Sequence, residues 1–244
     1  MKRHLTITAI CFFIIYIIII TVSAIPGNIL LKASGLSQPF ATALTEVVVI
    51  LLWLIFDRTY LKSGITLQTT RNQQHWWMLV FILIMIGGDS LLVASYHLTV
   101  SSVLTALILG LLVGAAEEFV FRGLLISFLK KYFTLTALQI ALWSGVIFGA
   151  VHVVNVSSSG NLLNTVAQIL GAFGIGFLLA AIYLITNNLW MIMIGHGLID
   201  AFDQIAFSSL SNAVGTSIFT GVLYFVAYLL IGIWLLNKYQ PRVR

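Results

Sequence analysis

Three ionisable residues interrupt an apolar stretch of the chain that is otherwise typical of a membrane-spanning helix. Glu117 and Glu118 are adjacent, and Arg122 follows four residues later. Each such group costs roughly 2.5–3.5 kcal/mol to insert at the centre of a membrane helix. We therefore expect all three to face the protein interior or a wet cavity, and we treat the cluster as a functional-site hypothesis.

Helical spacing indicates which charged groups cooperate. Glu118 and Arg122 are four residues apart, so they lie on one face and can form an ion pair. Glu117 points about 100° away from that face, since a helix has ~3.6 residues per turn, and is left free for chemistry. His196 and Asp200 are also four residues apart, which allows Asp200 to orient the imidazole or to fix its tautomer.

Other polar side chains are expected at membrane depth. His152 is predicted to lie within a helix, with Phe148 on the same face and Asn155 three residues further on. One interpretation is that the Glu118–Arg122 and His196–Asp200 pairs only hold helices together. That interpretation leaves Glu117 and His152 unexplained, which favours a functional site. Six of the seven acidic residues fall inside predicted helices: Glu46, Asp89, Glu117, Glu118, Asp200 and Asp203.

The chemistry that these groups favour is hydrolysis. A carboxylate and an imidazole from different helices form a competent water-activating pair. A second imidazole beside a carboxylate or carboxamide can stabilise the oxyanion of a tetrahedral intermediate. Together they would cleave a peptide bond without a serine or cysteine nucleophile.

A metal-dependent mechanism is the alternative. No His-Glu-x-x-His signature is present in the sequence. Glu117, His152 and His196 nevertheless match the ligand types of a catalytic Zn²⁺ site that keeps a water in the fourth position. We prefer the metal-free mechanism, which requires no cofactor.

The composition predicts an all-α, polytopic integral membrane protein. The chain has 244 residues, of which 60% are hydrophobic and 8% are charged. Apolar runs long enough to cross a ~30 Å hydrocarbon core predict about eight transmembrane helices in a single membrane-embedded domain, 1–244, with a motif-bearing core at about 102–208. These runs are 5–25, 40–56, 76–94, 102–128, 135–154, 162–185, 189–207 and 216–236.

Charge placement predicts the orientation in the membrane, because short cytoplasmic loops collect Lys and Arg. In the eight-helix arrangement Lys32 falls on one side, Arg122 lies within a helix, and the other basic residues gather on the opposite side. We therefore expect both termini to be cytoplasmic. No basic patch is interleaved with base-stacking aromatic residues, so we expect no nucleic-acid partner.

Three motifs resemble those of a known family. Glu-Glu-Phe-Val-Phe-Arg at 117–122, Phe-Gly-Ala-Val-His at 148–152 and His-Gly-Leu-Ile-Asp at 196–200 resemble the EExxxR, FxxxH and HxxxN/D motifs of the CPBP or Abi family. That family includes type II CAAX prenyl endopeptidases and bacteriocin-processing or bacteriocin-immunity proteins. The resemblance runs from about Leu111 to Gln204, and the predicted helix count fits the fold of the family.

The resemblance implies catalytic roles for two residues at the first two motifs. It identifies Glu117 as the water-activating carboxylate and His152 as the residue that holds the same water. Glu118 and Arg122 are implied to support them, and we also predict supporting roles for Phe148 and Asn155.

At the third motif the resemblance implies that His196 and position 200 stabilise the oxyanion. Position 200 is Asp, where the prenyl proteases usually have Asn. An ionised carboxylate accepts hydrogen bonds but donates none. Asp200 would therefore have to be protonated, orient His196 or bind a metal.

The expected substrate is a small peptide or a membrane-associated precursor, such as that of a bacteriocin or pheromone, and the expected location is a bacterial plasma membrane. Two other function classes remain open. One is a non-enzymatic immunity protein that binds a bacteriocin. The other is a proton-coupled transporter, although transporters usually show inverted repeats and interrupted helices, and this sequence has no paired segments of that kind.

Overall fold

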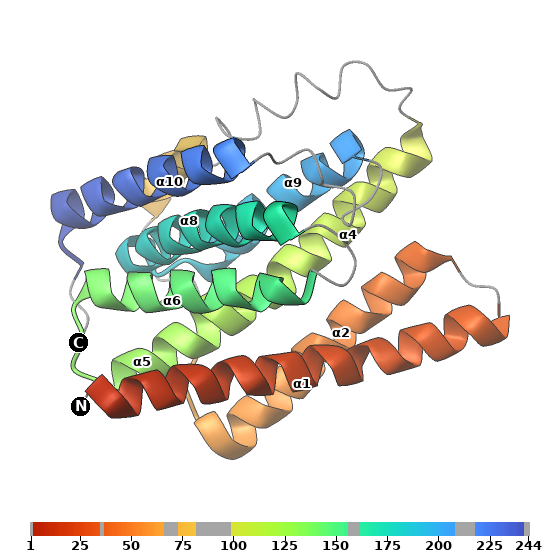
Figure 1. The fold of residues 1–244 in the computed structure, drawn as a ribbon, viewed down its shortest axis with the longest axis horizontal. Coiled ribbons are helices and arrows are strands. Elements are labelled where there is room, and N and C mark those ends of the chain that lie inside the picture. The colour runs from red at the N-terminus through yellow and green to blue at the C-terminus, as the bar shows by residue number, and fades with distance from the viewer. Residues whose placement is uncertain are drawn as a thin grey trace.

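The structure, a computed structural model, describes residues 2–34, 37–65, 73–81, 99–155, 162–207 and 218–241. All regular elements within these ranges are helical, as the composition predicts. Figure 1 shows long helices packed side by side, with α1 and α2 along one flank and α10 along the other.

Two helices form a hairpin at the N-terminal end of the chain. α1 (Lys2–Ser34) runs the length of the molecule, and α2 (Gln38–Phe56) returns beside it (Figure 1). α2 continues into the π-helical turn η1 (Asp57–Leu61), and the 3-10 helix η2 covers Gln73–Met78.

The remaining helices contain the three motifs. α4 (Val100–Glu118), the π-helical segment η3 (Phe119–Leu125) and α5 (Ile126–Tyr132) form one continuous rod. α6 (Ala137–Val151) ends in the 3-10 turn η4 (His152–Asn155). Then come α8 (Leu162–Thr186), α9 (Leu189–Phe207) and α10 (Ile218–Tyr239).

Local sequence explains where the two motif-bearing helices α4 and α6 begin. Thr99 and Ser102 form a reciprocal capping box at the start of α4. Thr136 and Gln139 form the same arrangement at the start of α6. Each box satisfies two backbone N–H groups that have no partner within the helix, so both helices start at a defined residue.

Six of the described helical stretches are long and apolar enough to cross a membrane. This supports the predicted polytopic architecture. α1 is longer than the predicted run 5–25, because a run of apolar residues marks the membrane core rather than the end of a helix, and Pro26 lies within α1. Most of the predicted third run, 76–94, lies outside the described residues.

Small residues bring α4 and α9 into close contact. A Cβ atom added to Gly114 would lie 2.7 Å from the Cα of Gly197 and 3.0 Å from the carbonyl oxygen of Met193. Gly110 faces Gly197 and Ala201 in the same way. Membrane helices approach closely where such residues meet, and this seam places the two glutamates of α4 beside the histidine of α9.

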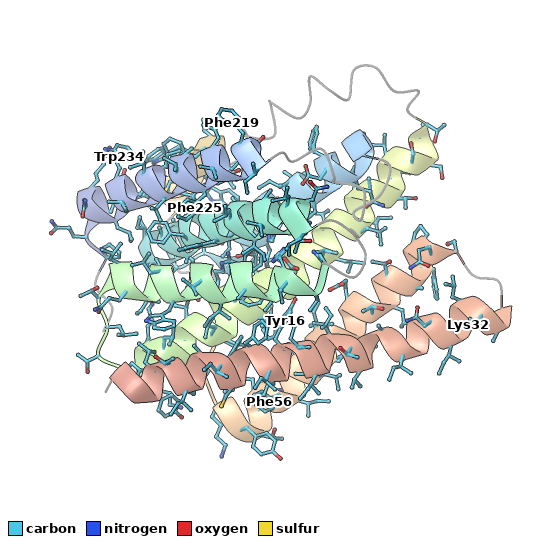
Figure 2. The ribbon with its side chains drawn as sticks, in the orientation of Figure 1. Tyr16, Lys32, Phe56, Phe219, Phe225 and Trp234 are labelled. Carbon is cyan, nitrogen blue, oxygen red and sulfur yellow. The ribbon has the colours of Figure 1, made fainter. Side chains whose placement is uncertain are left out.

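Both ends of the chain lie at the same end of the molecule (Figure 1). Lys131, near the end of α5, donates a hydrogen bond to the carbonyl oxygen of Lys62, with 2.6 Å between Nζ and oxygen. Lys32 lies at the opposite end, where α1 finishes (Figure 2). This arrangement agrees with the charge asymmetry seen in the sequence.

Candidate active site

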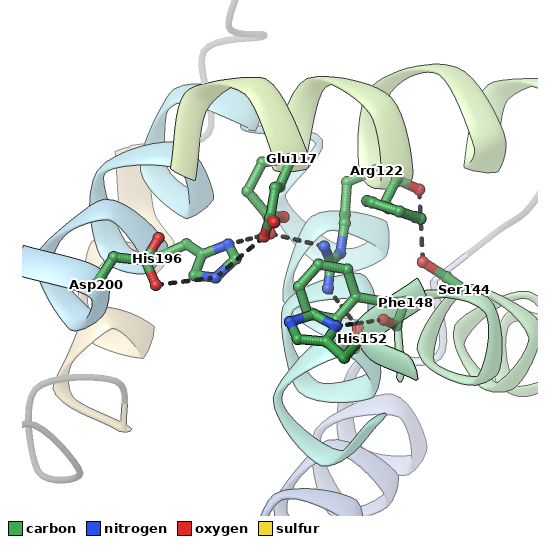
Figure 3. A network of polar contacts seen from close by, with 10 residues as sticks. Glu117, Arg122, Ser144, Phe148, His152, His196 and Asp200 are labelled. Atoms are coloured by element: carbon green, nitrogen blue, oxygen red, sulfur yellow. Dashed lines mark hydrogen bonds and ion pairs between the residues drawn. The ribbon is translucent and has the colours of Figure 1, made fainter. Parts of the chain in front are cut away.

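Three helices contribute side chains to one polar cluster in the interior of the bundle (Figure 3). The two glutamates come from the end of α4, His196 and Asp200 come from α9, and Phe148 and His152 come from the end of α6. Glu117 lies near the middle of the candidate span Val100–Tyr132, so the cluster is at membrane depth.

Glu118 joins the first and third motifs. Its Oε1 accepts a hydrogen bond from Arg122 Nη1 at 2.7 Å and another from His196 Nδ1 at 2.7 Å. The side chains of Glu118 and Arg122 are fully buried. The Glu118–Arg122 pair predicted from the spacing is therefore present, and the same carboxylate also fixes the orientation of His196.

The other nitrogen of His196 faces two carboxyl groups. Nε2 lies 3.7 Å from Oε2 of Glu117 and 3.6 Å from Oδ1 of Asp200. The spacing indicated that Asp200 could fix the tautomer of His196. In the structure it is Glu118 that accepts the hydrogen bond from His196 Nδ1 and so fixes the tautomer. Because Nδ1–H donates to Glu118, Nε2 is left to act on Glu117, Asp200 or a ligand.

Arg122 is held by three contacts. Besides Glu118, it donates from Nη2 to the carbonyl oxygen of Gly176 on α8 at 3.0 Å. Its guanidinium lies 4.5 Å from the centroid of the Phe148 ring, a cation–π distance. Gly176 permits this, because a Cβ there would lie 2.9 Å from Phe148 and 3.3 Å from Arg122. Arg122 therefore ties α4, α6 and α8 together.

His152 lies next to the Phe148 ring (Figure 3). The Phe148 ring centroid is 5.0 Å from that of His152 and 5.6 Å from that of His196. The Phe148 carbonyl oxygen is 2.8 Å from His152 Nδ1, and a carbonyl only accepts, so Nδ1 carries the proton. In the neutral imidazole Nε2 is then an acceptor.

Within the described residues, no hydrogen bond or ion pair joins His152 to Glu117. The structure thus brings Glu117, His196 and Asp200 together and places His152 beside them. The predicted supporting residue Asn155 donates from Nδ2 to Gln168 Oε1 at 3.1 Å, which links the end of α6 to α8.

The first and second motifs each contain an irregular helical segment. η3 begins directly after Glu118 and contains Arg122, and η4 begins at His152. Single π-helical turns within α-helices occur frequently at functional sites. These turns replace the simple α-helical geometry from which we estimated the side-chain directions.

Sequence reasoning did not include Glu46 in the site. This residue lies on α2, is 8% exposed, and interacts electrostatically with Asp200 and Glu117. The available signal was its position as an acid near the centre of an apolar run. The spacing rules join residues within one helix only, so they did not connect it to the motifs.

The zinc ligand set considered from the sequence is not assembled. In the part of the chain that the structure describes, no three His, Cys, Asp or Glu side chains are grouped so that they could hold a metal ion. His152 is turned toward the Phe148 carbonyl, while Glu117 and His196 face each other. These three residues do not fit a shared metal in this arrangement, and we assign no step to one.

Residues 99–202 match the family described as Type II CAAX prenyl endopeptidase Rce1-like. All four predicted catalytic residues, Glu117, His152, His196 and Asp200, lie inside the matched region. The family resemblance recognised from the three motifs is thereby confirmed over this region. The description of that family names an endopeptidase, and the six described helical stretches that are long and apolar enough to cross a membrane support a multi-pass membrane protein. No curated protein matches the chain.

Proposed function

We propose that this protein is an intramembrane endopeptidase that hydrolyses a peptide bond of a small peptide or membrane-associated precursor. The observation that carries the proposal is the environment of Glu117. Its side chain is 19% exposed and lies beside His196 Nε2 at the centre of a membrane-spanning rod, within the region that matches the protease family. An ionisable group in that place favours chemistry over packing.

In the proposed reaction Glu117 removes a proton from a water molecule as the water oxygen bonds to the scissile carbonyl carbon. His152 Nε2, the acceptor nitrogen of the ring, holds that water. The carbonyl π electrons move onto oxygen, and the resulting oxyanion accepts hydrogen bonds from Nε2–H of His196 in its doubly protonated form and from Asp200 in its protonated form. Glu117 then passes its proton to the amide nitrogen as the C–N bond breaks.

The residues that hold these groups have separate tasks. Glu118 accepts from His196 Nδ1–H and so directs Nε2 toward the reacting carbonyl. Arg122 balances the charge of Glu118, and the Phe148 ring contacts both imidazoles. The proposed mechanism therefore needs no nucleophilic side chain.

The proposed substrate class is a short precursor peptide, such as that of a bacteriocin or pheromone, that reaches the site from the membrane. The proposed location is the plasma membrane of a bacterium.

The test is cleavage of a panel of quenched fluorescent peptides by the protein purified in detergent. The panel holds precursor-type peptides and one peptide with a prenylated C-terminal Cys-a-a-X sequence. Glu117→Gln keeps the volume of the side chain but cannot take a proton from water. We expect it to lower kcat by about 10²–10⁴-fold, the usual contribution of general acid–base catalysis.

Asp57→Asn is the matched control, because it makes the same chemical change at a buried carboxyl outside the site. Asp57 Oδ1 accepts from the Ser63 N–H at 2.9 Å at the end of α2, and an amide oxygen can replace it. This variant should cleave normally. Wild-type activity in Glu117→Gln would refute the catalytic assignment.

The same variant separates the protease from an immunity protein. If the chain protects cells from a bacteriocin only by binding it, Glu117→Gln should protect as well as the wild type. If protection depends on cleavage, Glu117→Gln should lose it, while Asp57→Asn should keep it.

A further inference from the structure

Ser144 on α6 is fully buried, and its hydroxyl group turns toward a neighbouring helical segment. Its Oγ donates a hydrogen bond to the carbonyl oxygen of Phe121 in η3, with 3.4 Å between the two oxygens (Figure 3). Ser144 forms no other hydrogen bond with the described residues. A hydroxyl at membrane depth thus joins the helix of the second motif to the segment that contains the first.

Other hydroxyl groups in the helices of this protein bond within their own helix. A Ser or Thr in a helix commonly donates to the carbonyl oxygen four residues earlier. The described side chains that do so include Thr21, Ser23, Thr42, Thr45, Thr59 and Thr186. Ser144 forms no such bond to Ile140 among the described residues, so its direction is set by the packing of α6 on η3.

The acceptor lies in the segment that links the glutamates of the first motif to its arginine. The Phe121 carbonyl belongs to the peptide group that ends at the nitrogen of Arg122, inside η3. At the end of η3 the N–H of Ile126 donates to Gly123, three residues back, whereas a π-type bond spans five residues. Where a membrane helix departs from regular α-helical bonding, Ser and Thr side chains can bond the freed backbone groups. Ser144 is placed to do so.

Ser144 also shares a face of its helix with the second motif. Ser144, Phe148 and His152 follow one another at four-residue spacing. The Phe148 ring lies edge-on to the ring of Phe121, with centroids 5.0 Å apart, and 4.5 Å from the guanidinium of Arg122. A hydroxyl and an aromatic ring, one turn apart on α6, therefore contact two consecutive residues of η3.

We propose that Ser144 is a positioning residue that fixes the Phe121–Arg122 peptide group and, through Arg122, the place of Glu118 and His196. Arg122 donates to Glu118 at 2.7 Å, and the same carboxylate oxygen accepts from His196 Nδ1 at 2.7 Å. A shift of the Arg122 backbone would move this series of contacts, and with it the imidazole that is proposed to bind the oxyanion. The effect on rate rests on the proposed proteolysis, whereas the contact with η3 does not.

Ser144→Ala removes the donor without adding volume. We expect kcat to fall by about 10-fold, because a displacement of about 1 Å that starts far from the reacting atoms can cost about 100-fold. KM should stay unchanged, since the substrate loses no contact. The bond is longer than the usual range of about 2.5–3.0 Å between two oxygens, so melting in detergent should stay close to the wild type. Ser144→Cys, with a weaker donor of similar size, should give an intermediate kcat.

Ser23→Ala is the matched control, because it makes the same change at another fully buried serine in a helix. Ser23 Oγ donates to the carbonyl oxygen of Ile19 in its own helix, at 2.7 Å. This variant should keep the wild-type kcat. A wild-type kcat in Ser144→Ala, or an equal loss of kcat in Ser23→Ala, would overturn the proposed effect on rate.

Nuclear magnetic resonance gives a readout that needs no substrate. Phe is followed directly by Arg once in the sequence, at Phe121–Arg122. Labelling Phe with carbonyl ¹³C and Arg with ¹⁵N therefore marks a single peptide group. Its carbonyl signal in detergent should shift in Ser144→Ala and keep its position in Ser23→Ala. An unmoved signal in Ser144→Ala would refute the contact that the proposal needs.

The two measurements separate this inference from the proposed function. If the signal shifts but no form of the protein cleaves any peptide of the panel, the proteolytic function fails while the positioning of the peptide group stands. If cleavage depends on Glu117 and Ser144→Ala cleaves like the wild type, the positioning role in catalysis fails alone.

Discussion

A single oxygen of Glu118 accepts hydrogen bonds from Arg122 on its own rod and from His196 on α9. Both bonds end on the same carboxylate oxygen, and the bond from Arg122 also has a charged donor. Both are buried, where hydrogen bonds to charged groups are strong. Glu118 thus performs two tasks with one atom. It neutralises a guanidinium at membrane depth, and it sets the ring orientation on which the proposed oxyanion contact depends.

Glu118→Ala should lower the stability of the folded protein. The change leaves Arg122 buried with an uncompensated charge, and breaking a buried pair in this way costs about 3–5 kcal/mol. We expect a lower yield and an earlier thermal transition in detergent. Glu117→Gln is the comparison variant and should melt close to the wild type, because Glu117 takes part in no hydrogen bond among the described residues. Wild-type melting of Glu118→Ala would mean that the ion pair contributes no stability.

A metal chelator should leave cleavage intact if Glu117 and His152 activate the water without a metal ion. The measurement is the cleavage rate after dialysis against a chelator, together with the zinc content of the purified protein. If cleavage instead depends on a bound zinc ion, the cleavage rate should fall on chelation and return when zinc is added. Stoichiometric zinc with that behaviour would contradict the metal-free mechanism and would require His152 to leave the Phe148 carbonyl.

At the scale of helices, the seam between α4 and α9 decides whether the site exists at all. Gly110 and Gly114 on α4 meet Gly197 on α9. Backbones that approach this closely place Glu118 within hydrogen-bond distance of His196. A wider seam would separate the first motif from the third, although every catalytic side chain would still be present.

Gly197→Ala should therefore impair both folding and cleavage. The new Cβ would lie 2.7 Å from the Cα of Leu111 and 2.9 Å from the carbonyl oxygen of Gly110, so backbone must move. Gly171→Ala on α8 is the matched control, because no described atom beyond the adjacent residues and the nearby backbone of its own helix lies within 4 Å of the added Cβ. That variant should be as stable as the wild type or more stable by up to about 1 kcal/mol, since Ala is the better helix former. Equal behaviour of the two variants would refute the role of the seam.

The sequence predicted contacts within a helix better than contacts between helices. Four-residue spacing identified the Glu118–Arg122 pair and placed Asp200 near His196, because the geometry of one helix is known in advance. The hydrogen bond from His196 to Glu118 and the place of Glu46 depend on how separate helices pack. The π-helical turn after Glu118 has no Gly or Pro signal at its first residue, so the pattern did not reveal it.

At the scale of the whole molecule, the positions of the basic residues agree with the arrangement of the helices. The chain ends lie at one end of the bundle, where Lys131 contacts Lys62, and Lys32 lies at the other end. The excess of Lys and Arg marks the cytoplasmic side of most membrane proteins. The proposed catalytic cluster lies between these two ends, so the proposed peptide substrate would have to reach it from within the membrane or through a polar path.

The predicted orientation can be measured with single cysteines, because Cys11 is the only cysteine of the chain and Cys11→Ser removes it. In that background we place a cysteine at Ser37, an exposed residue directly before α2, or at Tyr60, which is 76% exposed at the opposite end of α2. A membrane-impermeant maleimide should label Ser37→Cys in spheroplasts and Tyr60→Cys only after the membrane is permeabilised. The Cys11→Ser background without an added cysteine should stay unlabelled throughout. Labelling of Tyr60→Cys in sealed spheroplasts, with Ser37→Cys protected, would place the termini outside the cell and invert the orientation that the positive charges predict.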